Sequence, residues 1–155
     1  MTKYIAILFS FLIIVSCGSK TANYPSRDLL KHGFSISVKA PVDAKIASDD
    51  FGVMKELTIQ SGEEYNVQIL KSNSNTTVVA DALGGQMKLV KSDRYFTKVI
   101  EEHDNGFIFE KDIDGNINYD FRYIKLIGDQ EYIYQTGMMG TYTEEAVRTM
   151  YESVQ

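Results

Sequence analysis

The residues best suited to metal or acid–base chemistry gather around one of the two histidines. His103 lies in the run Glu101-Glu102-His103-Asp104, and imidazole and carboxylate groups are common metal ligands. Because alternate residues of a strand share one face, Glu101 and His103 are expected to converge if this run is extended. The other histidine, His32, lies far away in the sequence. The run also fits a solvated strand end leading into an Asn105-Gly106 turn, and we favour that interpretation over a metal site.

A second acidic run resembles a calcium loop only in part. Residues 112–118 alternate oxygen-bearing side chains as an EF-hand loop does, but Gly115 follows the second acid directly. Position twelve, counted from Asp112, is Tyr123, where an EF-hand needs glutamate. The flanking segments are typical of strands. The run therefore predicts a hairpin turn.

The chain lacks the usual nucleophile and phosphate-binding patterns. It contains no G-x-S-x-G elbow, and Gly84-Gly85 is surrounded by neither a Walker nor a G-x-G-x-x-G pattern. Ser35 and Ser37 fall on the outward face of an expected strand, where small polar residues are ordinary. We predict no catalytic residue, no cofactor and no metal, and hence a protein that is not an enzyme.

The single cysteine lies where a lipid-attachment site needs a thiol. After Lys3, the apolar run over residues 4–15 is too short to span a bilayer as a helix, which takes about 20 residues. It fits the hydrophobic region of a secretory signal. Ile14-Val15-Ser16-Cys17 resembles the lipobox of bacterial lipoproteins, although Leu and Gly or Ala are commoner at positions 14 and 16. The resemblance implies cleavage before Cys17 and a membrane anchor of lipid on Cys17.

Residues after Cys17 bear on which membrane holds the anchor. Position 18 is Gly, not the Asp that retains many enterobacterial lipoproteins in the inner membrane, and the first acidic residue is Asp28. By resemblance to lipoproteins of the Bacteroidetes type, the lack of an acidic cluster implies an outer-membrane protein that faces the periplasm. We therefore predict a signal peptide over residues 1–16, a lipidated cysteine and tether over 17–32, and a domain over 33–155.

Composition limits the class of protein. The chain has 155 residues, which suits one domain, and its one cysteine excludes an intrachain disulfide and a cysteine-rich zinc site. Its net charge of −5 and pI near 5.0 argue against a general nucleic-acid binder. We expect a membrane and a protein as partners, and no nucleic acid.

Hydrophobic periodicity predicts strands interrupted by one helix and followed by another. The first helix is expected after a cap at Thr76 or Thr77, and its Gly84-Gly85 indicates close packing against the sheet or a kink. Its expected apolar face consists of Val79, Ala82, Leu83, Met87 and Val90. The second is expected to begin at Thr143, or at Thr141 with Glu144 completing a capping box. Short connectors imply antiparallel neighbours, and hence an α+β domain with an antiparallel sheet flanked by helices. Strands are expected over residues 34–40, 53–60, 65–70, 95–101, 107–111, 117–126 and 131–135.

Two sequence motifs and this order of elements suggest a family. The stretch Phe34-Ser-Ile-Ser-Val-Lys-Ala-Pro41 and the closing Tyr142-Thr-Glu-Glu-Ala-Val-Arg-Thr-Met-Tyr-Glu-Ser-Val154 resemble small PsbP/Mog1-like domains. The resemblance covers roughly residues 30–155 and implies an antiparallel sheet sandwiched between helices. It also implies an accessory or binding role, since PsbP is an accessory subunit of a photosynthetic complex and Mog1 binds a small GTPase. No partner-binding motif of either protein can be matched here.

Two rows of aromatic residues form the first candidate contact surface. Tyr119, Phe121 and Tyr123 share one face of an expected strand, and Tyr132 and Tyr134 share one face of the next. Such rows can form a ligand platform. More often they are the core face beneath a helix, and we favour that interpretation.

A methionine pair forms the second candidate contact surface. Met138 and Met139 lie between Gly137 and Gly140, just before the last helix. Methionine is common at adaptable contact surfaces, and it also fills buried gaps. The sequence favours neither alternative.

These observations lead to a ranked set of functions. The first is a non-enzymatic envelope lipoprotein that acts as an accessory or binding protein for another envelope protein. The alternative is a small-ligand binding module that uses the tyrosine-rich sheet face. A metal-dependent or hydrolytic enzyme ranks last, because it would need His103 or His32 to meet carboxylates in a cleft.

Overall fold

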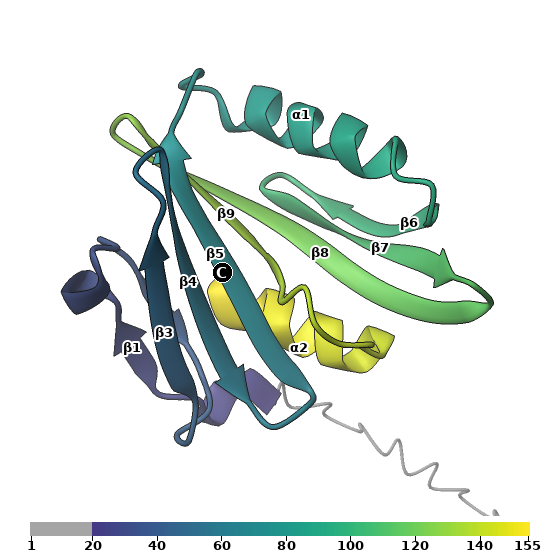
Figure 1. The fold of residues 1–155 in the computed structure, drawn as a ribbon, viewed down its shortest axis with the longest axis horizontal. Helices are drawn as coiled ribbons and strands as arrows, with labels where there is room; N and C mark the ends of the chain where they lie inside the picture. Colours follow the sequence, from purple (N-terminus) through teal and green to yellow (C-terminus); the bar gives the residue numbers. More distant parts are fainter. Residues whose placement is uncertain (1–19) are drawn as a thin grey trace, which may run out of the picture.

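A seven-stranded antiparallel sheet dominates the structure, a computed structural model that describes residues 20–155 (Figure 1). The predicted signal peptide and Cys17 lie outside the described residues. Every neighbouring pair in the order β3-β4-β5-β9-β8-β7-β6 is antiparallel, which confirms the predicted single α+β domain. The strands are β3 (Lys45–Asp50), β4 (Met54–Ser61), β5 (Tyr65–Asn73), β6 (Phe96–His103), β7 (Gly106–Ile113), β8 (Asn116–Ile127) and β9 (Gln130–Thr136).

Most neighbouring strands in the sheet follow each other in the chain and are joined by hairpin turns. In the β7–β8 turn, Asp114 and Gly115 both have positive φ, 54° and 87°, as a tight two-residue hairpin requires. The Gly115 amide donates to the Asp112 carboxylate at 2.7 Å. The turn predicted over residues 112–118 is therefore confirmed.

Strand β3 was not predicted. It is an edge strand, and Ile46 is its only large apolar residue. Ile46 pairs with Ile59 of β4 and packs against the core, while most of the strand is exposed. A strand with one inward apolar residue carries no alternating pattern to detect.

Helix α1 (Val79–Lys91) covers one face of the sheet, where Leu83 and Val90 pack with Phe107, Phe109 and Ile124. It starts one or two residues later than predicted, because its cap is Val78, which makes no side-chain hydrogen bond, and not Thr76 or Thr77. The close packing expected at Gly84-Gly85 is wrong, because a β-carbon at either residue would meet no atom within 4 Å. The helix runs unbroken through both glycines.

Helix α2 (Glu144–Val154) covers the opposite face (Figure 1). The Thr143 hydroxyl accepts a 3.2 Å hydrogen bond from the Ala146 amide, which confirms the predicted cap at Thr143. The helix buries an apolar stripe, which consists of Val147, Met150, Tyr151 and Val154. Within residues 20–155, neither helix is long and apolar enough to cross a membrane.

The N-terminal segment also packs on the α2 face. It comprises the short 3-10 helices η1 (Lys20–Asn23) and η2 (Leu30–His32) and the strands β1 (Ser26–Asp28) and β2 (Ser37–Lys39), which pair with each other. From Lys20 onward the expected tether over residues 17–32 is therefore folded against the domain, with Leu29 fully buried in the main core. Elements of three or four residues have no periodic signal in the sequence, so the sequence predicts a tether here.

Candidate functional site

The two tyrosine rows lie in the core and form no ligand platform. Tyr132 and Tyr134 are 1% and 0% exposed, and Tyr123 is 8% exposed. The Tyr123 ring packs edge-on against Tyr134 at 5.4 Å and against Tyr151 of α2 at 5.9 Å. Tyr119 is half-buried at the margin of this cluster. The sheet face that carries the tyrosines is covered by α2 and the N-terminal segment, so Tyr132 and Tyr134 cannot contact a partner or ligand in the folded domain.

The methionine pair is instead the most exposed apolar feature near α2. Met138 and Met139 are 81% and 87% exposed, so they do not form a buried plug. They lie in the loop between β9 and α2, which we call the methionine loop (residues 137–142). Adjacent, flexible apolar side chains that are exposed on a loop suit contact with another apolar surface.

Both ends of the methionine loop are tied to the domain. The Gly137 amide donates to the Asn66 carbonyl at 2.8 Å, and the Tyr142 amide donates to the Asn118 side-chain oxygen at 2.7 Å. The Tyr142 hydroxyl donates to the Met139 carbonyl at 3.1 Å. The loop thus presents its two methionines from a fixed base, which reduces the entropy lost on binding.

The predicted convergence of Glu101 and His103 does occur. The Glu101 carboxylate lies 2.6 Å from His103 Nε2, and its other oxygen pairs with Arg148 of α2. The His103 ring stacks on Tyr151 at 5.3 Å. Hydrogen bonding from Arg148 holds the Glu101 pKa below its usual range.

This arrangement links β6 to α2 and does not resemble a metal centre. The guanidinium of Arg148 pairs with both Glu101 and Glu144, and its positive charge disfavours a second cation beside Glu101. His32 lies on η2, where its Nδ1 faces the Ser48 hydroxyl at 3.3 Å. Over residues 20–155, no group of three or more His, Cys, Asp or Glu side chains is placed to hold a metal ion.

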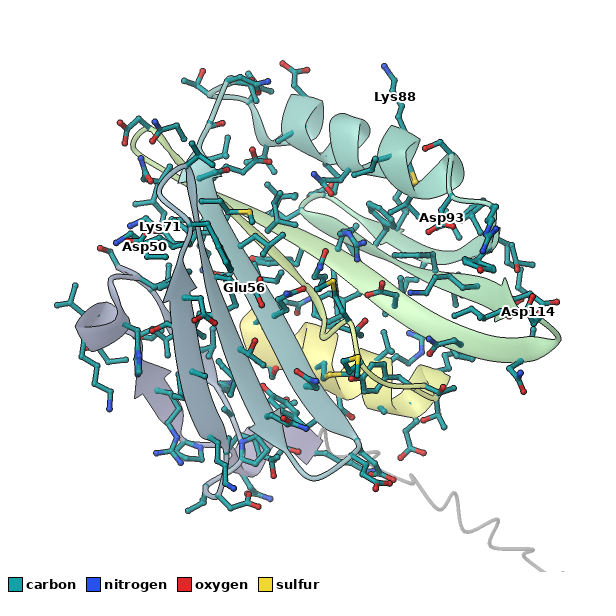
Figure 2. The ribbon with its side chains drawn as sticks, viewed as in Figure 1. Asp50, Glu56, Lys71, Lys88, Asp93 and Asp114 are labelled. Carbon is teal, nitrogen blue, oxygen red and sulfur yellow. The ribbon has the colours of Figure 1, made fainter. Side chains whose placement is uncertain are left out.

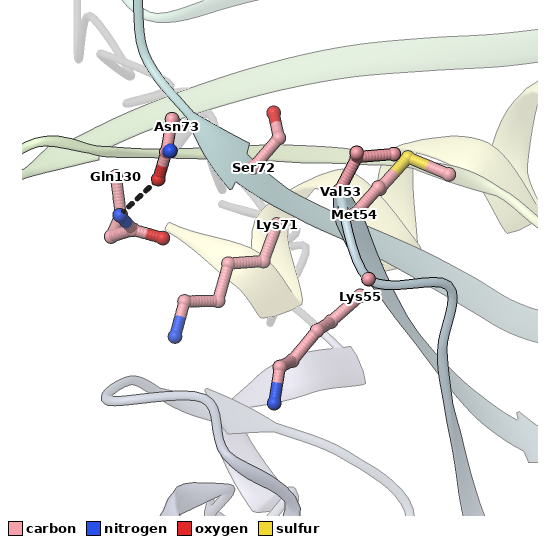
Figure 3. A pocket seen from close by; sticks show the side chains of 8 residues that line it. Val53, Met54, Lys55, Lys71, Ser72, Asn73 and Gln130 are labelled. Carbon is pink, nitrogen blue, oxygen red and sulfur yellow. Dashed lines mark hydrogen bonds between the residues drawn. The ribbon is translucent and has the colours of Figure 1, made fainter.

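Two lysines line a polar hollow of about 320 Å³ at the end of the sheet where β4 and β5 meet the β8–β9 turn (Figure 3). Lys55 and Lys71 extend side by side into it. The Lys71 ammonium donates to the Gly33 carbonyl at 2.8 Å and lies 5.8 Å from the centre of the Tyr132 ring. Lys55 pairs with Asp50 at 2.8 Å. The Lys71 contact connects the N-terminal segment to the sheet, and the Lys55–Asp50 pair joins the ends of β3 and β4.

A charged group that sequence analysis missed lies on the α1 face. Asp120 of β8 is buried between Lys111 at 3.0 Å and Arg122 at 3.2 Å. Burial alone would raise the Asp120 pKa, but the two cations outweigh it and hold the pKa below its usual range. The alternating pattern of β7 could have indicated this group, because Lys111 shares a strand face with Phe107 and Phe109, where an apolar residue is expected.

Comparison with known proteins identifies no family. No family model matches the chain, and no curated protein matches it. A crystal structure of a protein from Bacteroides thetaiotaomicron VPI-5482 is similar, with a TM-score of 0.38 and 12% sequence identity. The similarity covers 76% of this chain and 43% of that protein, so the chain spans less than half of its length.

Proposed function

We propose that this protein is an envelope lipoprotein, anchored through Cys17 in the outer membrane and facing the periplasm, whose PsbP/Mog1-like domain binds another envelope protein without catalysis. The observation that carries the binding role is the exposure of the methionine loop. Its Met138 and Met139 side chains are more than four-fifths exposed, and hydrogen bonds fix the loop to the domain. An antiparallel sheet with a helix on each face supports the PsbP/Mog1-like assignment. The lipobox-like residues 14–17 support the anchor.

The proposed anchor and the methionine loop belong to the same end of the molecule. Lys20 of η1 pairs with Glu145 in the first turn of α2 at 2.6 Å. Cys17 precedes Lys20 by three residues, a length of chain that reaches about 10 Å at most. The loop ends immediately before the α2 cap at Thr143. The proposed partner therefore meets the loop close to the membrane surface, as another lipoprotein or an integral membrane protein would.

Membrane attachment is tested with a Cys17→Ala variant expressed in the native host and fractionated. We expect the protein to leave the membrane fraction while its thermal unfolding stays unchanged, because position 17 precedes the folded segment. A variant that stays fully in the membrane fraction would refute the anchor.

The partner contact is tested by placing a photo-crosslinking amino acid at position 138 in native cells. A matched probe at Val53, which is 88% exposed on the β3–β4 hairpin, serves as the control. We expect one envelope protein to crosslink at position 138 and not at position 53, and a Met139→Asp substitution to abolish that crosslink. Equal crosslinking at both positions, or no specific product at position 138, would refute the methionine loop as the contact.

A further inference from the structure

A groove of about 350 Å³ lies between the C-terminal end of α1 and strands β7 and β8. This volume is within the range of small-molecule sites. The groove combines an apolar wall with a charged floor. Its principal lining residues are Leu89, Val90, Phe109, Lys111, Asp120 and Arg122.

The floor of the groove carries a surplus positive charge. Two cations, Lys111 and Arg122, share the single carboxylate of Asp120. All three side chains are shielded, with 19%, 14% and 7% of their surfaces exposed. Asp120 is also saturated as an acceptor, since it takes hydrogen bonds from the Thr136 amide at 3.1 Å and the Thr136 hydroxyl at 2.7 Å. The group therefore retains one net positive charge in a partly desolvated site.

Arg122 has donor capacity that the protein does not use. Its Nη1 donates to the Phe121 carbonyl at 2.7 Å, while its Nε is buried and has no hydrogen-bond partner among the described residues. Buried donors are normally satisfied, and leaving one unpaired is unfavourable. An anion bound on the floor of the groove would neutralise the surplus charge and offer an acceptor to the Arg122 guanidinium.

The apolar wall defines the rest of the ligand. Leu89 of α1 is 63% exposed at the rim, and Phe109 lies beneath the two cations, 5.7 Å from Lys111 Nζ and 5.3 Å from the Arg122 guanidinium carbon. Asp93, just beyond the end of α1, adds a negative charge at the rim and disfavours multiply charged anions (Figure 2).

From these contacts we propose that the groove binds a small monocarboxylate with an apolar tail, whose carboxylate pairs with Arg122 and Lys111 and whose tail lies against Leu89. This site is distinct from the methionine loop and lies on the sheet face opposite α2. The domain would then bind a small molecule in addition to the proposed protein partner. It does not depend on that role or on the anchor.

The test uses 4-phenylbutyrate as the probe and 4-phenylbutyramide as its uncharged match, with residues 20–155 observed by amide NMR. We expect saturable shifts at Leu89, Phe109 and Arg122 with phenylbutyrate, at a Kd near or below about 1 mM. The amide should bind at least about tenfold more weakly, because it cannot form the charge-assisted bonds. Equal binding of the two compounds, shifts confined to other surfaces, or no saturation would overturn the proposal.

Substitutions at the rim test the charge requirement without touching the buried group. Leu89→Glu is expected to bind phenylbutyrate about tenfold more weakly than Leu89→Lys, because both remove the apolar contact to the tail but only glutamate adds a negative charge at the rim. Both residues keep helix propensity at this exposed position. Lys88→Gln, whose side chain points away from the sheet, removes a cation outside the groove and should leave the Kd unchanged (Figure 2). A separate substitution within the buried group, Arg122→Gln, removes a proposed carboxylate partner and should abolish the shifts while the rest of the spectrum stays folded. Equal affinity in Leu89→Glu and Leu89→Lys would overturn the proposal.

Discussion

Gly137 passes so close to Asn66 that a β-carbon at residue 137 would lie 2.3 Å from the Asn66 side-chain nitrogen. The Gly137 amide also donates to the Asn66 carbonyl at 2.8 Å. This contact between the end of β9 and the start of β5 fixes where the chain leaves the sheet. It therefore determines the direction in which Met138 and Met139 project.

A Gly137→Ala substitution is expected to lower the free energy of unfolding by about 1–3 kcal/mol, because the added methyl group has no room beside Asn66. Urea denaturation measures the change. The matched control is Gly85→Ala in α1, where a β-carbon would meet nothing within 4 Å. That substitution should raise the free energy of unfolding by about 0.5–1 kcal/mol, since alanine loses less conformational entropy than glycine in a helix. Similar effects of the two substitutions would contradict the close approach at Gly137.

Local signals were sufficient to predict most of the sheet and the second helix. Thr143 with acidic residues after it indicated a helix start, and the structure places the cap there. Asp114-Gly115 indicated a tight hairpin because few other residue pairs tolerate positive φ. These features depend on residues close together in the chain, so the sequence alone contains the information.

Features that depend on contacts between residues far apart in the chain were harder to predict. The tyrosine rows of β8 and β9 look the same in the sequence whether a helix or a ligand covers them, and the packing of α2 decides between the two. The environment of Asp120 depends on Lys111 of a neighbouring strand and on Thr136, which lies after another turn. Hydrophobic periodicity does not reveal such contacts. Charged residues on an otherwise apolar strand face do indicate where a buried charged group lies.

Acid should destabilise the domain partly through Asp120. An unfolded aspartate takes up its proton near pH 3.9, and the folded Asp120 pKa is lower because Arg122 and Lys111 outweigh the effect of burial. Between the two values the unfolded state binds more protons, so the contribution of Asp120 to stability is present above pH 3.9 and is lost as pH falls through the folded pKa. Urea denaturation across about pH 7 to pH 2 should show this loss, and a smaller pH dependence in Asp120→Asn.

The same variant tests the energetics of the buried charges. At neutral pH, Asp120→Asn should lower the free energy of unfolding by about 3–5 kcal/mol, because Lys111 and Arg122 lose their shared counter-charge. The double variant Asp120→Asn/Arg122→Gln should recover part of that loss by removing one unpaired cation. If the double variant is less stable by the sum of the two single effects, the ion-pair interpretation is wrong.

Alkaline pH should act through the buried tyrosines. Burial raises the pKa of Tyr65 and of Tyr151 to about 12, and it raises the Tyr134 pKa further. An unfolded tyrosine loses its proton near pH 10, so between about pH 10 and pH 12 the folded state keeps protons that the unfolded state has lost. Their contribution to stability is therefore complete below pH 10 and declines as pH rises towards 12.

Phenolate absorbance should rise in two stages, with the second coinciding with the loss of the circular dichroism signal. Tyr151→Phe should shift alkaline unfolding to higher pH, and a single stage with an unchanged dichroism signal would show that the tyrosine face is open to solvent.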